Sequence, residues 1–288
     1  GKFDPKEIGP TDVQKNNGVI DYVAEDEKDA TNIAKKILSY FQGDIKDWKA
    51  DDQTQLSNIM PKDRRWSYPV RDIIKIISDI GEFTEIKPEY GKGIVSCFIR
   101  IEGKSFGLLA NDSQHLGGAI DSEAADKASS FIEMCSEYGL PIISLVDTPG
   151  FMVGPDSEKE GAVRRMSNLF KIGSKVKVPL TAIFLRKGYG LGAQAMVGGS
   201  LHEPVYTAAW PTGEFGAMGL EGAVKLGFKK ELEKIEDNSK REELFNSLVE
   251  KLYDKGKAIE AAAHLEIDAV INPSETRSVI LKSQKAFV

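Results

Sequence analysis

Apolar residues follow two different periods along the chain, and the period changes near residue 90. Over residues 25–41 they recur every three or four positions behind three acidic residues, which predicts an amphipathic helix with its acids at the positive end. A second helix is expected over residues 69–80. Residues 42–68 are polar and follow neither period, so we expect a linker or surface excursion there with little chemistry.

Short apolar runs then predict strands. Ile94–Ile101 and Ser105–Ala110 flank Glu102-Gly103-Lys104, a pattern typical of a hairpin. The next expected elements are a helix over residues 122–138, a strand over 141–146, a helix near 160–173 and a strand over 178–185. Glycine-rich joints between strands and helices indicate an α/β fold with its sites at the strand ends.

The carboxyl-terminal part is expected to be mainly helical. Residues 228–256 are highly charged with a sparse apolar stripe, which favours a peripheral helix. Asn272-Pro273-Ser274-Glu275 combines a cap, a proline at the first helical position and a carboxylate three residues after the cap. This pattern predicts the start of a last helix.

Composition restricts the class of protein. The 288 residues are 41% apolar and 28% charged, and no run approaches the roughly 20 apolar residues of a membrane span. The net charge of −6 argues against nucleic-acid binding. Cys97 and Cys135 lie in apolar patterns that suggest no disulfide framework, so we expect a reducing compartment: the cytoplasm, or the mitochondrial matrix in a eukaryote.

Two classes of site are unsupported. The three histidines share no metal-ligand spacing, and no Gly-x-Ser-x-Gly element occurs, so neither a metal site nor a serine hydrolase is expected. The sequence begins Gly-Lys-Phe-Asp-Pro, without a basic region followed by an apolar run. We therefore expect no secretory signal and interpret the chain as a fragment.

Three joints concentrate glycine, each directly after an apolar strand: Leu116-Gly117-Gly118-Ala119, Asp147-Thr148-Pro149-Gly150-Phe151 and Gly188-Tyr189-Gly190-Leu191-Gly192-Ala193-Gln194. Glycine lets the backbone approach a ligand closely, and a helix start presents unpaired N–H groups that can hold an oxyanion. The alternative is that each joint is only a tight turn. Three joints in one domain favour a site.

The second joint also matches the Asp-x-x-Gly element of GTPases. No Gly-x-x-x-x-Gly-Lys-Ser/Thr loop accompanies Asp147 to hold the β- and γ-phosphates. A nucleotide switch is therefore disfavoured.

Several motifs in one order resemble the carboxyltransferase subunits of propionyl-, acetyl- and methylcrotonyl-CoA carboxylases. They are Leu116-Gly-Gly-Ala-Ile-Asp121, Lys127-Ala128, Val146-Asp-Thr-Pro-Gly-Phe151, Arg186-Lys187 to Met196, Ala209-Trp-Pro211, Met218-Gly-Leu-Glu-Gly-Ala223 and Ile267-Asp268 to Thr276-Arg277. The resemblance covers roughly residues 9–280 and implies a crotonase-like ββα spiral fold. It also implies that residues 1–68 end an amino-terminal domain and linker, and that residues 69–288 form the carboxyl-terminal carboxyltransferase domain.

In that family biotin binds mainly to the carboxyl-terminal domain of one subunit and acyl-CoA mainly to the amino-terminal domain of another. The resemblance therefore implies that this chain holds the biotin side. Carboxybiotin gives up CO2, and the biotin left behind removes the α proton of the thioester, so peptide N–H groups aimed at the growing negative charge lower the barrier. No side-chain base is required.

The resemblance assigns the catalytic N–H groups to Gly192 and Ala193, with Gly118 and Ala119 as a companion element or, alternatively, a structural turn. The other expected substrate- and biotin-binding residues line the same joints: Gly117, Asp147, Thr148, Pro149, Gly150, Phe151, Gly190, Gln194, Ala195, Met218 and Gly219. Ala195 departs from the propionyl-type pattern, which has an aspartate that helps to select the acyl chain. The acyl group is therefore open.

The chain shows no Met-Lys-Met biotinylation motif and no ATP-binding domain. The resemblance thus implies biotin carried on another chain, a biotin carboxyl carrier or biotin carboxylase subunit as partner, an acyl-CoA substrate, and a hexamer built from dimers. Two alternatives stay open: the carboxyltransferase subunit of a sodium-pumping decarboxylase, and a non-catalytic crotonase-like assembly partner.

Overall fold

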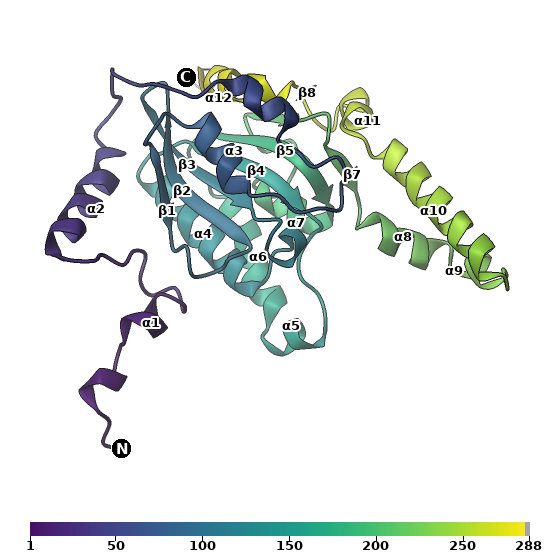
Figure 1. Ribbon diagram of the computed structural model, residues 1–288, viewed down its shortest axis with the longest axis horizontal. Helices are drawn as coiled ribbons and strands as arrows, with labels where there is room; N and C mark the ends of the chain where they lie inside the picture. Colours follow the sequence, from purple (N-terminus) through teal and green to yellow (C-terminus); the bar gives the residue numbers. More distant parts are fainter. Residues whose placement is uncertain (286–288) are drawn as a thin grey trace.

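A single mixed sheet organises the chain (Figure 1). The computed structural model describes residues 1–285, and the strand order is β1-β2-β3-β4-β5-β6-β8, with β7 paired to the end of β5. The strands are β1 (Phe83–Ile86), β2 (Ile94–Ile101), β3 (Lys104–Asn111), β4 (Ile142–Thr148), β5 (Leu180–Tyr189), β6 (Tyr206–Ala209), β7 (Glu214–Gly216) and β8 (Ala269–Val270). β1, β2 and β3 are antiparallel, whereas β3 to β8 pair in parallel. The expected α/β class is confirmed.

The β2–β3 hairpin forms as predicted, because its turn residues adopt the left-handed region that a two-residue turn requires. Glu102 has φ 51° and Gly103 has φ 76°. A Cβ atom on Gly103 would lie 1.9 Å from the carbonyl oxygen of Ile45, so glycine is also required by space.

Helices cover both faces of the sheet. Their bounds are α1 (Thr11–Gln14), α2 (Glu27–Ser39), α3 (Val70–Ile77), α4 (Ser122–Glu137), α5 (Pro155–Lys159), α6 (Ala162–Gly173), α7 (Gly190–Met196), α8 (Leu220–Gly227), α9 (Lys229–Glu233), α10 (Asn238–Lys255), α11 (Ala258–Ala263) and α12 (Thr276–Lys285). The apolar residues of α4 and α6 pack on one face, and those of α3 and α12 pack on the other. Every residue of β4 is buried, and its successive side chains enter these two cores alternately.

The segment expected to be a plain linker is partly ordered against the sheet. A 3-10 helix spans Gln53–Asn58, and Leu56 and Tyr68 are buried in the core that contains α3. The expectation of a surface excursion is therefore wrong for the second half of residues 42–68. The domain boundary at residue 68 stays a prediction.

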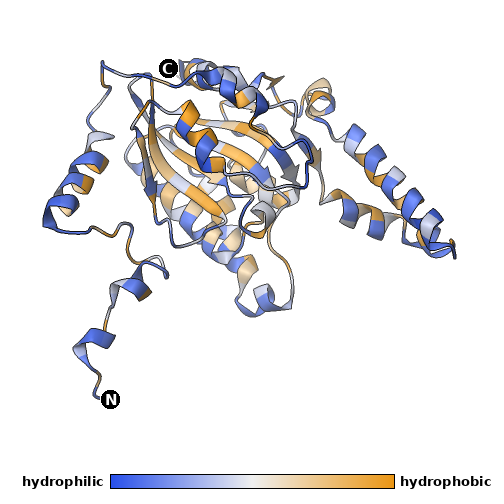
Figure 2. Ribbon diagram, in the orientation of Figure 1, coloured by the Kyte–Doolittle hydropathy of each residue, from blue (hydrophilic) through white to orange (hydrophobic). Residues whose placement is uncertain are grey.

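The helices between β7 and α11 lie at the periphery of the molecule. α8, α9 and α10 form an arm that projects from the sheet, and α10 has no buried residue, which confirms the peripheral position predicted from its charge. The hydropathy colouring shows apolar residues concentrated in the sheet and its covering helices (Figure 2). The cap at Asn272 opens a 3-10 turn (Pro273–Glu275) that continues into α12, as expected. Within residues 1–285, no helix is both long and apolar enough to cross a bilayer.

Candidate functional site

The site begins where β5 ends and α7 starts. Gly190 has φ 58°, a left-handed conformation that turns the chain from the strand into the helix. The N–H groups of Leu191 and Gly192 lie in the first turn of α7, where an α-helix leaves its backbone donors without an intrahelical acceptor. They are therefore available to an external oxygen.

The three glycine joints predicted from the sequence meet in space. Gly192 packs against the backbone of Gly150 and Phe151, which follow β4. The Gly150 carbonyl accepts from the Ile120 N–H (3.0 Å), and the Ile120 carbonyl accepts from the Met152 N–H (2.8 Å). Thr148 Oγ1 accepts from the Gly150 N–H (3.1 Å) and stabilises this loop. The loops after β3 and β4 thus form one hydrogen-bonded layer beneath α7.

An apolar cavity of about 590 Å³ opens beside this layer. Its apolar side chains come from the loop after β4, from α6, from the start of α7 and from the loop after β7: Phe151, Met152, Val163, Met166, Phe170, Leu191 and Met218. Of the expected site residues, Pro149, Gly150, Phe151, Gly190, Gly192, Met218 and Gly219 line it. This cavity is called the apolar cavity below.

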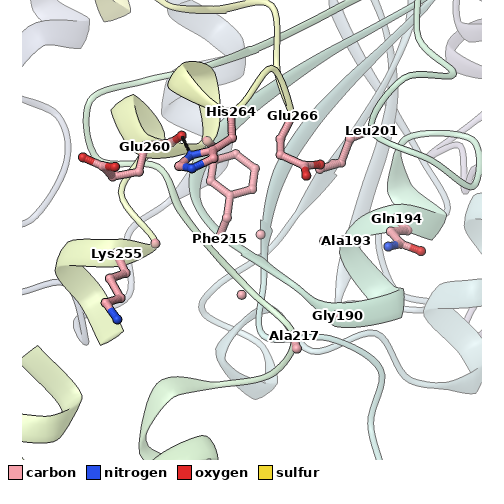
Figure 3. A pocket seen from close by; sticks show the side chains of 14 residues that line it. Gly190, Ala193, Gln194, Leu201, Phe215, Ala217, Lys255, Glu260, His264 and Glu266 are labelled. Carbon is pink, nitrogen blue, oxygen red and sulfur yellow. Dashed lines mark hydrogen bonds between the residues drawn. The ribbon is translucent and has the colours of Figure 1, made fainter. Parts of the chain in front are cut away.

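A second cavity of about 450 Å³ adjoins α7 (Figure 3). Ala193 and Gln194 contribute to its lining, and Lys255, Glu260, His264 and Glu266 add polar side chains on the other side. Gly190 and Ala217 line both cavities. The start of α7 and the loop after β7 therefore form a shared wall between them.

Asp147 and Thr148 lie in the core and line neither cavity. Asp147 is fully buried and accepts from Arg186 Nη2 (2.9 Å) and from the Lys187 N–H (3.0 Å). The Arg186 guanidinium also donates to the Trp66 carbonyl (2.7 Å) and lies 4.9 Å from the Tyr68 ring centroid. Because this ion pair joins β4 to β5 and to the segment before α3, its position indicates a structural role.

The joint at Gly117–Ala119 lines neither cavity, and its amides are engaged. The Gly118 N–H donates to the His115 carbonyl (2.9 Å), and the Ala119 N–H donates to the Leu116 carbonyl (3.2 Å). Gly118 has φ 89°, and a Cβ atom there would lie 2.3 Å from the Asp147 carbonyl oxygen. Lys187 Nζ bonds the Gly117 carbonyl. These contacts favour the structural turn over free oxyanion donors for Gly118 and Ala119.

Ala195 has a different environment from the one expected. Its methyl group is fully buried among apolar core side chains and lines neither cavity. Ala195 therefore faces neither of the two cavities beside α7, and its link to the acyl group stays a prediction.

Sequence reasoning missed a charged cluster beside the shared wall. Arg64 lies 3.5 Å from Glu214 and 3.0 Å from Glu221, and Glu214 is buried next to Tyr189. Burial raises the pKa of the Glu214 carboxyl, an effect that the Arg64 charge opposes. Only the basic run Lys62–Arg65 hinted at Arg64, and no local pattern connects it to residues 150 positions away.

Residues 5–288 match the family described as "Carboxyl transferase domain". The chain is 34% identical over 284 residues to the methylmalonyl-CoA carboxyltransferase 12S subunit of Propionibacterium freudenreichii subsp. shermanii, covering 94% of this chain and 53% of that protein. It is 31% identical over 277 residues to methylmalonyl-CoA decarboxylase subunit alpha of Veillonella parvula, covering 93% and 52%. The chain thus spans about half the length of these relatives.

Solved structures of similar proteins superpose closely on this chain. A single-chain, multi-domain long-chain acyl-CoA carboxylase superposes with a TM-score of 0.91 at 50% identity, covering 98% of this chain and 28% of that one. The transcarboxylase 12S structure, a hexamer assembly with methylmalonyl-CoA bound, gives a TM-score of 0.88 at 31% identity, covering 100% and 56%.

Proposed function

The chain belongs to the carboxyl transferase domain family, and we propose that it forms the biotin-side half of a site where CO2 passes from carboxybiotin to the α carbon of an acyl-CoA. The crotonase-like fold expected from the sequence agrees with this membership. The observation that carries the proposal is the pair of first-turn N–H groups at Leu191 and Gly192, at the edge of the apolar cavity.

The residues present fit a biotin head group. When bound, biotin supplies the carboxyl group and then the base for the α proton. The Gly192 N–H donates to the ureido oxygen, and the start of α7 adds its positive dipole end at the point where negative charge grows. Phe151, Met166 and Leu191 line the apolar cavity, so these electrostatic interactions act beside apolar side chains, where they are screened less than in open water.

Ala193 belongs to the same turn, and we assign it the supporting role in holding this oxygen. Gly118 and Ala119 act indirectly, because their turn supports the loop on which Gly192 packs. Met218 and Gly219 form the opposite part of the wall.

The character of the apolar cavity supports an apolar acyl group. Met152, Met166 and Met218 line it, and the flexible thioether side chain adapts to ligands of different shape. The relative described as a long-chain acyl-CoA carboxylase agrees with this substrate class.

The family resemblance also implies partners for this chain. We assign biotin to a carrier subunit, acyl-CoA binding to the amino-terminal half of a second copy, and the assembly to a hexamer of the 12S type in the cytoplasm or mitochondrial matrix. Because relatives include a decarboxylase subunit, the reverse direction is the second candidate.

Binding of three biotin analogues to the 288-residue chain, measured by titration calorimetry, tests the proposal. Biotin and desthiobiotin both present a ureido oxygen, whereas 2-iminobiotin replaces that acceptor with a cationic guanidinium group. We expect the first two to bind alike and 2-iminobiotin to bind about tenfold or more weakly, because the α7 N–H groups would face another donor. Equal affinity for all three would remove the oxyanion role. Absence of biotin binding would contradict the biotin-side assignment.

A further inference from the structure

One arginine joins three elements next to the transfer site. Arg64 Nη2 donates to Glu221 Oε1 (3.0 Å) in the first turn of α8, and Nη1 lies 3.5 Å from Glu214 Oε1 at the start of β7. The guanidinium carbon also lies 5.3 Å from the Tyr253 ring centroid in α10. Arg64 itself comes from the segment before α3, so these contacts bridge the core and the projecting arm.

The contact with Glu214 matters because this acid is 1% exposed. Within residues 1–285, neither Glu214 carboxylate oxygen has a partner at hydrogen-bond geometry. The Arg64 charge, the neighbouring Tyr189 hydroxyl and the Arg186 charge each lower the pKa of this carboxyl against the effect of burial. Among the described residues, Arg64 is the cation that lies within 4 Å of this buried carboxylate, and its charge is the largest of the effects that oppose burial. Removing the arginine would leave an uncompensated buried charge, a situation that drives local rearrangement.

β7 transmits any such rearrangement to the wall between the cavities. It pairs with the last residues of β5, where Lys187, Gly188 and Tyr189 lie opposite Glu214, Phe215 and Gly216. The next residue, Ala217, lines both cavities, and its carbonyl oxygen would lie 2.8 Å from a Cβ atom on Gly190. A displacement of β7 thus moves the wall directly against the residue that starts α7.

We propose that Arg64 is a positioning residue for the transfer site. It touches no reacting atom; through Glu214 and Glu221 it fixes β7 and the start of α8, and thereby the width of both cavities and the orientation of the α7 N–H groups. That the ligand is biotin rests on the proposed function, whereas the role of Arg64 in fixing the wall between the two cavities does not.

The neighbouring residue provides a matched control. Among residues 1–285, Arg65 forms a salt bridge with Asp63 alone, within its own turn, and its side chain is 73% exposed. Arg64→Ala should raise hydrogen exchange at the amides of residues 214–221 while leaving α4 and β2 protected, and should weaken biotin binding about tenfold. Arg65→Ala should behave as the wild type. Millimolar guanidinium chloride, but not sodium chloride, should restore both properties of Arg64→Ala by occupying the vacated site.

The contrary outcomes are distinct. Unchanged exchange at residues 214–221 in Arg64→Ala, or a uniform rise across the sheet without guanidinium rescue, would overturn the positioning role. If Arg64→Ala does not fold, the double variant Arg64→Ala/Glu214→Gln removes the uncompensated charge and should fold. It should still show raised exchange at residues 214–221. Normal exchange there would also overturn the positioning role of Arg64. A wild-type chain that binds no biotin contradicts the proposed function, and the exchange result then decides on Arg64 alone.

Discussion

Gly192 and Gly150 lie so close that a Cβ atom on Gly192 would be 2.7 Å from two backbone carbon atoms of Gly150. Gly192 does not adopt the left-handed region, so its backbone conformation alone would accept any residue. Space, rather than φ, requires glycine here. The same contact holds the first-turn amide of Gly192 against the loop that lines the apolar cavity.

Gly192→Ala is therefore expected to destabilise the chain by about 1–3 kcal/mol, the usual effect of inserting an atom into a closely packed site. Gly219→Ala is the control, because Gly219 lines the same cavity but has no atom within 4 Å of an added Cβ. Urea unfolding of both variants measures the difference. Equal stability of the two would show that the loop after β4 can move away at little cost.

Ala195→Asp is expected to act on stability rather than on substrate choice. Ala195 is fully buried in the apolar core, and an unpaired carboxylate there should lower the free energy of unfolding by about 3–5 kcal/mol. Gln194→Glu, which adds an acid at the exposed neighbouring position, should change it by less than about 0.5 kcal/mol. A stable Ala195→Asp variant whose preference among acyl-CoAs shifts would show that this position does reach the acyl group.

The sequence predicted best those elements that are long enough to repeat the apolar period several times. α4 and the β2–β3 hairpin follow from apolar stripes and turn residues that act locally. β6 and β8 have only four and two residues, which is too few to show a period. They form because β6 pairs with the edge of β5 and β8 pairs with the edge of β6. Such strands depend on tertiary pairing that no short window reveals.

The site was predictable at the level of joints but not of individual amides. Glycine content indicated that Gly118 and Gly192 both permit close approach. Only the folded geometry distinguishes them, since the Gly118 amide donates to the His115 carbonyl whereas the Gly192 amide lies in the first turn of α7, where the helix provides no acceptor. The role of Arg64 could not be predicted, because its partner Glu214 lies far along the sequence and a long-range ion pair leaves no periodic signal.

The 288-residue chain alone is expected to show no acyl-CoA carboxylation, because it spans about half of its curated relatives. Given free carboxybiotin and propionyl-CoA or palmitoyl-CoA, it should form no carboxylated product above background. Adding the amino-terminal half of a relative as a separate chain should produce turnover if the two parts assemble. Turnover by the pure 288-residue chain would show that it contains a complete acyl-CoA site.

Lys127 offers a test of the buried electrostatics, because it lies in α4 at 3% exposure and its Nζ donates only to the Tyr90 carbonyl (3.0 Å) among the described residues. Burial lowers the pKa of this amine from 10.5 to about 8. The unfolded chain therefore keeps the proton up to about pH 10.5 while the folded chain releases it near pH 8, so this group makes the free energy of unfolding rise between these two values.

Below pH 8 the buried charge should weaken the folded state by about 3 kcal/mol, from roughly 1.4 kcal/mol per pKa unit. Lys127→Met removes this penalty and loses a hydrogen bond of about 1 kcal/mol, so the variant should be more stable than the wild type at pH 7 by about 2 kcal/mol. The advantage should vanish or reverse by pH 10.5.

Lys104→Met, at an exposed position, should give a difference that does not depend on pH. Urea unfolding at pH 7, 8.5 and 10 measures these differences, and a Lys127→Met advantage that stays constant across this range would show that Lys127 keeps an ordinary pKa in the folded chain.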